Sequence, residues 1–164
     1  MKSMITHPFP PLFDQNCEIL ILGSFPSVKS REQMFFYGHP QNRFWKVISA
    51  VFGSDEPKTI AEKKEFLLSH KIALWDVIAS CEISGSSDSS IKNVVANDIS
   101  PILKGAKIRK IFVNGKTAEK YFKKYTQKAV GISAVCLPST SPANAAWSVE
   151  RLTVAWRDAI AEKG

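Results

Sequence analysis

The sequence predicts an α/β fold, a three-layer αβα sandwich built around a central four-stranded parallel sheet. Short apolar segments rich in β-branched residues alternate along the chain with segments of helical periodicity. Strands that are apolar on both faces are typical of a parallel sheet covered by helices on both sides. A chain of 164 residues, 45% of them hydrophobic, is long enough to bury a core, and we expect one domain over residues 1–164.

Four segments have the composition expected of the buried strands. In chain order they are Glu18–Leu22, Ile72–Val77, Lys110–Val113 and Ile132–Leu137. Residues 1–16 contain three prolines and predict an extended arm that lies on the domain. Residues 79–90 are dense in serine and glycine, and we expect them to form a loop.

Between these strands the sequence predicts helices over 41–52, 59–70, 91–95, 100–105, 116–125 and 148–162. Gly53 stops the first of them, and Thr59 with Glu62 forms the capping-box pattern that opens the second. Pro101 suits the first turn of the helix over 100–105, because that turn leaves its N–H groups unpaired in any case.

The chain carries an excess of basic residues. Its 22 Lys and Arg against 15 Asp and Glu give a net charge of +7, and the sequence pI is near 9.4. Such an excess favours a polyanionic partner, because Lys and Arg are attracted to phosphates.

The cysteines predict neither a disulfide framework nor a metal site. Cys17, Cys81 and Cys136 are widely spaced and form no Cys-x-x-Cys pair, so we expect reduced thiols in a cytoplasmic protein. No stretch approaches the roughly 20 apolar residues of a membrane span. Met1–Met4 lacks the apolar region of a signal peptide. We therefore expect no membrane attachment.

The stretch Gly23–Trp45 is the centre of the predicted site. Its residues 24–43 hold four aromatic side chains (Phe25, Phe35, Phe36 and Tyr37) and almost no acid, which suits a flat ring better than a metal. Polar, turn-forming pairs follow three of the predicted strands, namely Gly23-Ser24, Asn114-Gly115 and Pro138-Ser139. Ligands bind at this carboxyl edge in open parallel sheets, although the same residue types are also ordinary turn formers. The pattern predicts a pocket at the end of the first strand.

Three segments resemble the motifs of a known family. They are Gly23-Ser-Phe-Pro-Ser27 after the first strand, Tyr37-Gly-His-Pro-Gln-Asn-Arg-Phe-Trp-Lys46, and Leu137-Pro-Ser-Thr-Ser-Pro-Ala-Asn144 after the last strand. In this order they resemble the uracil-DNA glycosylase superfamily, and within it the hypoxanthine-DNA (deoxyinosine) glycosylase branch. The second segment is also similar to the mismatch-specific uracil-DNA glycosylases.

This resemblance implies a monofunctional DNA repair glycosylase. Such an enzyme flips a deaminated base out of DNA, hypoxanthine first and uracil second, and hydrolyses its N-glycosidic bond to leave an abasic site. No metal or other cofactor is required, and we expect a monomer whose partner is damaged DNA. Two alternatives remain: a uracil/thymine mismatch glycosylase, and a catalytically silent nucleic-acid-binding module.

The resemblance places the catalytic residues at Ser24 and Asn42. Most relatives have Asp or Asn at the position of Ser24, where it directs the attacking water, and a serine hydroxyl is a poor base. The hypoxanthine branch is believed to rely on Asn42 instead. Its amide can orient a water by accepting and donating hydrogen bonds. The alternative for Asn42 is an N-cap of the first predicted helix, and both roles can hold together.

The residues implied to contact the base are Phe25, Tyr37, Trp75, Asp76 and Asn114. Tyr37 matches the aromatic that stacks on the flipped base, and its alternative is core packing. The backbone N–H of Phe25 is placed to meet a base carbonyl. Either Trp75 or Asp76 supplies the base-reading group at the end of its strand. For Asn114 the alternative is an ordinary Asn-Gly turn.

The residues implied to contact DNA around the base are Ser27, Lys116, Ser139, Thr140 and Ser141. Uracil-specific relatives have a histidine where this chain has Leu137, so that contribution to the leaving base is missing or comes from elsewhere. The serines and the threonine then grip phosphates or enter the duplex, unless they only build a Ser-rich turn. The alternative for Lys116 is a solvated helix face.

Overall fold

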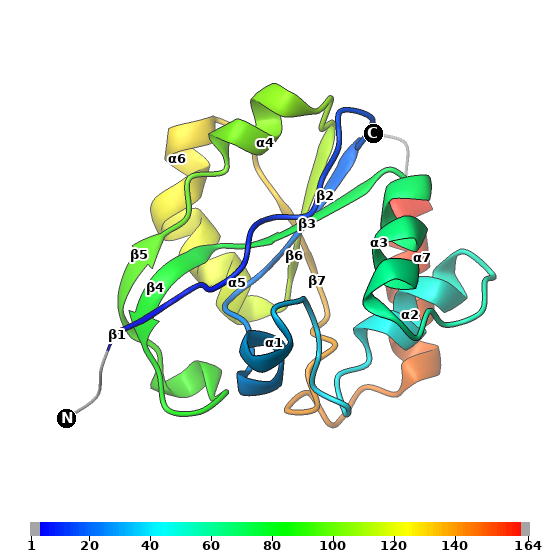
Figure 1. Cartoon of the computed structure of the whole chain (residues 1–164), viewed down its shortest axis with the longest axis horizontal. Helices are drawn as coiled ribbons and strands as arrows, with labels where there is room; N and C mark the ends of the chain where they lie inside the picture. The colour runs from blue at the N-terminus through cyan, green and yellow to red at the C-terminus, as the bar shows by residue number, and fades with distance from the viewer. Residues whose placement is uncertain (1–3, 162–164) are drawn as a thin grey trace.

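The computed structural model describes residues 4–161 and has at its centre a four-stranded parallel sheet, flanked by helices (Figure 1). The predicted α/β sandwich is confirmed. The strand order is β3-β2-β6-β7. The strands are β2 (Ile19–Gly23), β3 (Ile72–Asp76), β6 (Lys110–Asn114) and β7 (Val135–Leu137). The last strand begins at Val135 rather than at the predicted residue 132. Residues 132–134 belong to no helix or strand.

Strand β2 shows why the sheet needs helices on both faces. Leu20 and Leu22 point into one apolar cluster, and Ile19 and Ile21 point into the other. The first cluster lies beneath α4 (Ser100–Gly105) and α5 (Lys116–Tyr121). The helices over the second cluster, on the opposite side of the sheet in Figure 1, are α2 (Phe44–Val51), α3 (Ile60–Ser69) and α7 (Val149–Ala161).

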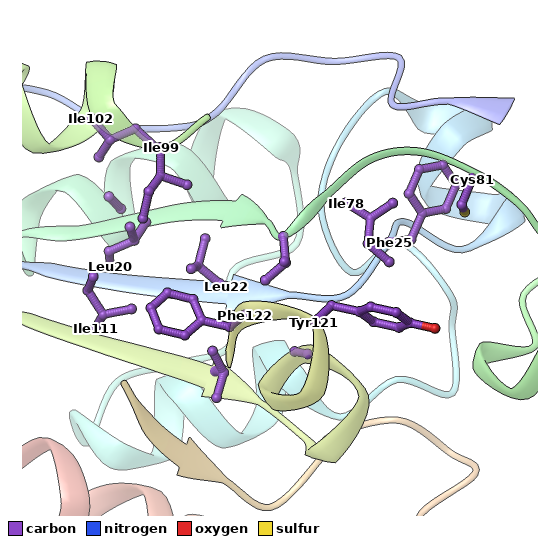
Figure 2. Close-up of a cluster of buried hydrophobic side chains, with 14 of the residues drawn as sticks. Leu20, Leu22, Phe25, Ile78, Cys81, Ile99, Ile102, Ile111, Tyr121 and Phe122 are labelled. Carbon is purple, nitrogen blue, oxygen red and sulfur yellow. The ribbon is translucent and has the colours of Figure 1, made fainter. Parts of the chain in front are cut away.

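The first cluster reaches from the middle of the sheet to the edge where the predicted site lies. Figure 2 shows Leu20 and Leu22 of the sheet beside Phe122, with Phe25 farther along next to Cys81. Phe122 begins a five-residue π-helical segment (Phe122–Thr126), after which α6 (Gln127–Val130) ends the helical run. The Phe25 side chain is therefore part of the core.

A second, antiparallel sheet corrects two predictions. Its strands, in the order β1-β4-β5, are β1 (Met4–Thr6), β4 (Ile78–Glu82) and β5 (Lys92–Ala96). The predicted loop over 79–90 was wrong for residues 79–82, and the predicted helix over 91–95 was wrong throughout. Two adjacent valines, Val94 and Val95, favour a strand, and strand β4 is available to pair with it. Only the 3₁₀ turn Asp88–Ser90 is helical in this region.

The arm before β2 is tied to both sheets. Residues Met4–Thr6 pair with β4, and Leu12 exchanges backbone hydrogen bonds with Leu74 of β3. Residues 1–3 of the predicted arm, and Glu162 at the predicted end of the last helix, lie outside the described residues.

The helix boundaries follow the capping chemistry. The capping box of Thr59 and Glu62 is present at the start of α3, as predicted. Helix α2 begins at Phe44 rather than at residue 41, and α1 (Val28–Gln33) was not predicted. Within residues 4–161, no helix is both long enough and apolar enough to cross a membrane.

Trp156 provides a test of the packing. Its side chain is fully buried, and its Nε1 donates to the carbonyl of Pro138 at 2.9 Å. We expect Trp156→Ala to lower the free energy of unfolding by about 3–5 kcal/mol, measured by urea denaturation followed by circular dichroism. The control Val154→Ala, on the same helix but 54% exposed, should change it by no more than about 0.5 kcal/mol. Similar losses in the two variants would contradict this packing.

Candidate active site

A cavity of about 1040 Å³ opens at the carboxyl edge of the parallel sheet. The strand register brings the ends of four strands to the same level, because Gly23 pairs with Asp76 and Asn114 with Leu137. Helix α1 and the loop before α7 lie at this same edge (Figure 1). The cavity is thus built where the sequence predicted a pocket.

Most of the predicted site residues line this cavity. Those that do so are Ser24, Phe25, Ser27, Tyr37, Asn42, Asp76, Asn114, Lys116, Ser139, Thr140 and Ser141. Trp75 does not line it, since its ring packs 4.4 Å from the ring of His7, between ring centroids. The open choice between Trp75 and Asp76 at the end of β3 therefore falls on Asp76 as the residue that reaches the cavity.

Two glycines allow the strand ends to approach their neighbours. A Cβ at Gly23 would lie 2.5 Å from Oδ1 of Asp76. Gly115 has a φ of +96°, and a Cβ there would lie 2.9 Å from the side chain of Ser139. Both positions therefore require the absence of a side chain.

A hydrogen-bonded chain links the motifs at the cavity wall. Nδ2 of Asn114 donates to the hydroxyl of Tyr37 at 3.2 Å and to Oγ1 of Thr140 at 3.0 Å. The Thr140 hydroxyl donates in turn to Oδ1 of Asn42 at 2.9 Å. The amide of Asn42 is thus fixed by Thr140, a residue of the loop after β7.

The contacts of Asn42 combine the two roles that the sequence left open. Its Oδ1 also accepts from the backbone N–H of Phe44 at 2.9 Å, so Asn42 does stabilise the first turn of α2. Since Thr140 supplies a second donor, both lone pairs of Oδ1 are used. Nδ2 of Asn42 has no hydrogen-bond partner among residues 4–161. What Asn42 offers the cavity is a donor, not an acceptor.

Tyr37 is held in an unusual conformation. Its φ is +52°, in the left-handed region, which costs a non-glycine residue of order 1–3 kcal/mol. The Tyr37 ring stacks on the ring of Phe44, with centroids 4.0 Å apart. One face of the Tyr37 ring is therefore used for packing in the core. Burial, and secondarily the charge of Asp76, raise the pKa of Tyr37 well above its ordinary value, so the hydroxyl stays protonated.

Asp76 is paired with a histidine that sequence reasoning missed. Nε2 of His7 lies 2.7 Å from Oδ2 of Asp76, which is 4% exposed. The arm carries His7 there, with its backbone N–H donating to Ala79 at 2.7 Å. The two partners are 69 positions apart, and no pattern in the sequence links them.

Asp88 is the second missed residue. Oγ of Ser24 donates to its carboxylate, at 3.1 Å from Oδ1 and 3.3 Å from Oδ2. Burial raises the pKa of the Asp88 carboxyl, against the opposing effect of the hydrogen bonds from Ser24 and Thr117. The sequence placed Asp88 in a Ser- and Gly-rich loop and gave no indication that it belongs to the site.

The loop after β7 is organised by Arg43. Its guanidinium donates to the carbonyls of Thr140, Ser141, Asn144 and Trp147. Thr140 itself is fully buried, which argues against the phosphate contact expected of it and leaves it a part of the hydrogen-bonded chain.

The two serines of this loop also make turn contacts. Ser139 Oγ accepts from the N–H of Ser141, and Ser141 Oγ from that of Ala143, each at 3.1 Å. Ser27 similarly caps α1 by accepting from the N–H of Ser30. All three side chains still border the cavity. No group of three or more His, Cys, Asp or Glu within residues 4–161 is placed to hold a metal ion.

A comparison with protein-family models shows which family this chain belongs to. The model of the uracil DNA glycosylase superfamily matches residues 10–160. The chain belongs to this superfamily. The turn Gly23–Ser27, the Asn42 segment and the loop after β7 all border the cavity.

Two relatives and one solved structure are similar over nearly the whole chain. A hypoxanthine DNA glycosylase of Methanosarcina acetivorans is 38% identical over 90% of this chain and 94% of its own length. Its counterpart from Methanosarcina barkeri is 37% identical over 83% and 86%. The solution NMR structure of a candidate uracil DNA glycosylase from M. acetivorans matches with a TM-score of 0.79 and 34% identity, covering 95% of this chain and 96% of that one.

Arg43 provides a test of how the loop is held. In Arg43→Lys a single ammonium replaces a planar fork that reaches four carbonyls, so at least one charge-assisted bond of about 1.5–3 kcal/mol is lost. We expect amide hydrogen exchange in residues 139–147 to accelerate at least about tenfold. Arg157→Lys is the matched control, because Arg157 donates to one exposed carbonyl, that of Ala50. Unchanged exchange in Arg43→Lys would show that the guanidinium does not hold the loop.

Proposed function

We propose that this protein is a DNA-deoxyinosine glycosylase, which removes hypoxanthine, and secondarily uracil, from DNA. The observation that carries the proposal is its similarity over nearly the full length to two hypoxanthine DNA glycosylases. The cavity supports it, because aromatic, amide and carboxylate groups converge there at the edge of the sheet. The net charge of +7 supports a DNA partner.

In this reaction the bond from C1′ of the sugar to N9 of the purine breaks, and its electron pair leaves with the base. An oxocarbenium-like sugar forms and is captured by water. Donors aimed at the departing base stabilise the negative charge that builds on it. Nδ2 of Asn42 is such a donor, fixed in place because Oδ1 is held by Phe44 and Thr140. Asn42 therefore acts by donating to the base rather than by accepting from the water.

We assign the reading of the base to Asp76. An ionised carboxylate accepts only, and hypoxanthine presents an N1–H donor that adenine lacks. Uracil presents an equivalent N3–H, which accounts for it as a second substrate. His7 holds one carboxylate oxygen, and Oδ1 has no hydrogen bond among residues 4–161. Tyr37, Asn114 and the N–H of Phe25 complete the pocket for the ring.

Lys116, Ser27, Ser139 and Ser141 are the proposed contacts to the DNA around the flipped base, and Thr140 is not among them. Lys116 is exposed and starts α5 at the cavity rim. We further propose that the protein acts as a monomer in the cytoplasm, where its three free cysteines stay reduced.

The test uses labelled duplexes with a single deoxyinosine, deoxyuridine or G·T site, treated with alkali after incubation. We expect strand breaks at deoxyinosine, fewer at deoxyuridine and none at G·T. Preferred cleavage at G·T or at uracil would favour the mismatch-specific alternative. Binding without breaks on every duplex would favour the silent module and contradict the proposal.

Two variants of Asn42 separate catalysis from helix capping. Asn42→Asp keeps an oxygen for Phe44 and Thr140 but removes the Nδ2 donor. We expect it to melt within a few degrees of the wild type, while its single-turnover rate on deoxyinosine falls by about 100-fold or more. Asn42→Ala should lose the same activity and also about 1 kcal/mol of stability. A wild-type rate in Asn42→Asp would rule out the donor role.

A further inference from the structure

The family resemblance implies that Ser24 stands at the position of a water-directing acid or amide, and in the structure its hydroxyl proton is committed to Asp88. We propose that Asp88, held by Ser24, accepts the proton of the attacking water, so that a carboxylate from the loop after β4 replaces the one missing after β2. This inference rests on the proposed function and deepens it.

The loop that carries Asp88 is anchored to α1 by two hydrogen bonds. Oγ of Ser86 accepts from the N–H of Val28 at 2.9 Å, and the carbonyl of Gly85 accepts from Arg31 at 3.0 Å. Both partners belong to α1, which directly follows the turn Gly23–Ser27. The 3₁₀ turn Asp88–Ser90 then presents the carboxylate to Ser24. Asp88 is therefore placed by the contacts of Gly85 and Ser86, the residues just before it, with α1.

Among the carboxylates that line the cavity, Asp88 is the one without an ion pair within residues 4–161. Three acidic residues line the cavity. Asp76 is paired with His7, and Glu119 pairs with Lys123 at 3.5 Å. No cation pairs with Asp88 among residues 4–161. Since Oδ1 of Asn42 already accepts two hydrogen bonds and Oδ1 of Asp76 is assigned to the base, Asp88 remains as the acceptor suited to the water.

The surroundings of Asp88 raise the pKa of its carboxyl, which favours a role as a general base. The residue is exposed to solvent and to the cavity, yet the protein around it raises its pKa, mainly by desolvation. A base whose pKa approaches the working pH accepts a proton more readily while remaining ionised. The titratable groups that act electrostatically on Asp88 or are acted on by it are Asp76, Tyr37, Cys81 and Tyr121.

The proton balance of the step is simple. As the C1′–N9 bond breaks, the oxygen of water bonds to C1′ and one of its protons passes to Asp88. The carboxylic acid then releases this proton to solvent, and the departed base takes up one proton from solvent. The sum is one water consumed for one free base and one abasic site, with no oxidant or reductant.

The test is the pH profile of the single-turnover rate on deoxyinosine DNA at saturating enzyme. In the wild type the rate should fall toward acid as Asp88 protonates, at a pH above the ordinary carboxyl value of about 4. Asp88→Asn should be slower at neutral pH by about 100-fold or more and should lose this acid limb. Asp55→Asn, an exposed change outside the cavity, is the control and should match the wild type.

Stability distinguishes this role from a structural one. Because the pKa of Asp88 is raised on folding, stability falls as pH rises from the ordinary carboxyl pKa to the raised one, and the full cost is present at pH 7. Asp88→Asn should therefore melt at or above the wild-type temperature at pH 7. Ser24→Ala should slow the reaction by about tenfold, and by less than about twofold in the Asp88→Asn background, because Ser24 acts through Asp88. Asp88→Glu should keep an acid limb at a reduced rate.

Three outcomes would overturn the inference. They are an Asp88→Asn rate within twofold of the wild type, an acid limb that persists in that variant, and an Asp88→Glu variant without an acid limb. If the wild type releases no base from any duplex, both the proposed function and this inference are wrong. An active wild type with an active Asp88→Asn leaves the function standing and rejects only Asp88.

Discussion

The hydroxyl of Thr140 is the interaction on which the site depends. It accepts from Asn114 at the end of β6 and donates to Asn42 before α2, so a single buried side chain joins segments about 100 positions apart. Arg43, next to Asn42, binds the carbonyls of the same loop. The amide that is proposed to act on the base is thereby oriented by the loop after β7, and neither segment is positioned without the other.

The parallel sheet and most of the cavity were predictable from the sequence, because they depend on local patterns. Short apolar strands such as Ile19–Gly23 and the turn residues after them indicate one edge where side chains meet. The second sheet was not predictable, since Val94 and Val95 form a strand only against β4. Periodicity in so short a segment does not separate a strand from a helix.

The side chains that act through distant partners were also beyond the sequence. Asn42 was identified, but the use of its Oδ1 by Phe44 and Thr140, which leaves its Nδ2 as the group open to the cavity, appears only in the fold. Neither His7 nor Asp88 belongs to a recognisable motif. His7 contacts Asp76 and Asp88 contacts Ser24, and in both pairs the partners are more than 60 positions apart in the sequence. Each of these contacts joins residues that no sequence pattern links.

The central claim is that this cavity hydrolyses the N-glycosidic bond of deoxyinosine. The most direct measurement is the amount of free hypoxanthine, determined by chromatography and mass spectrometry, released from a deoxyinosine duplex by the wild-type protein. We expect one hypoxanthine for each alkali-labile site formed. Strand breaks without free hypoxanthine, or a duplex that remains intact, would contradict it.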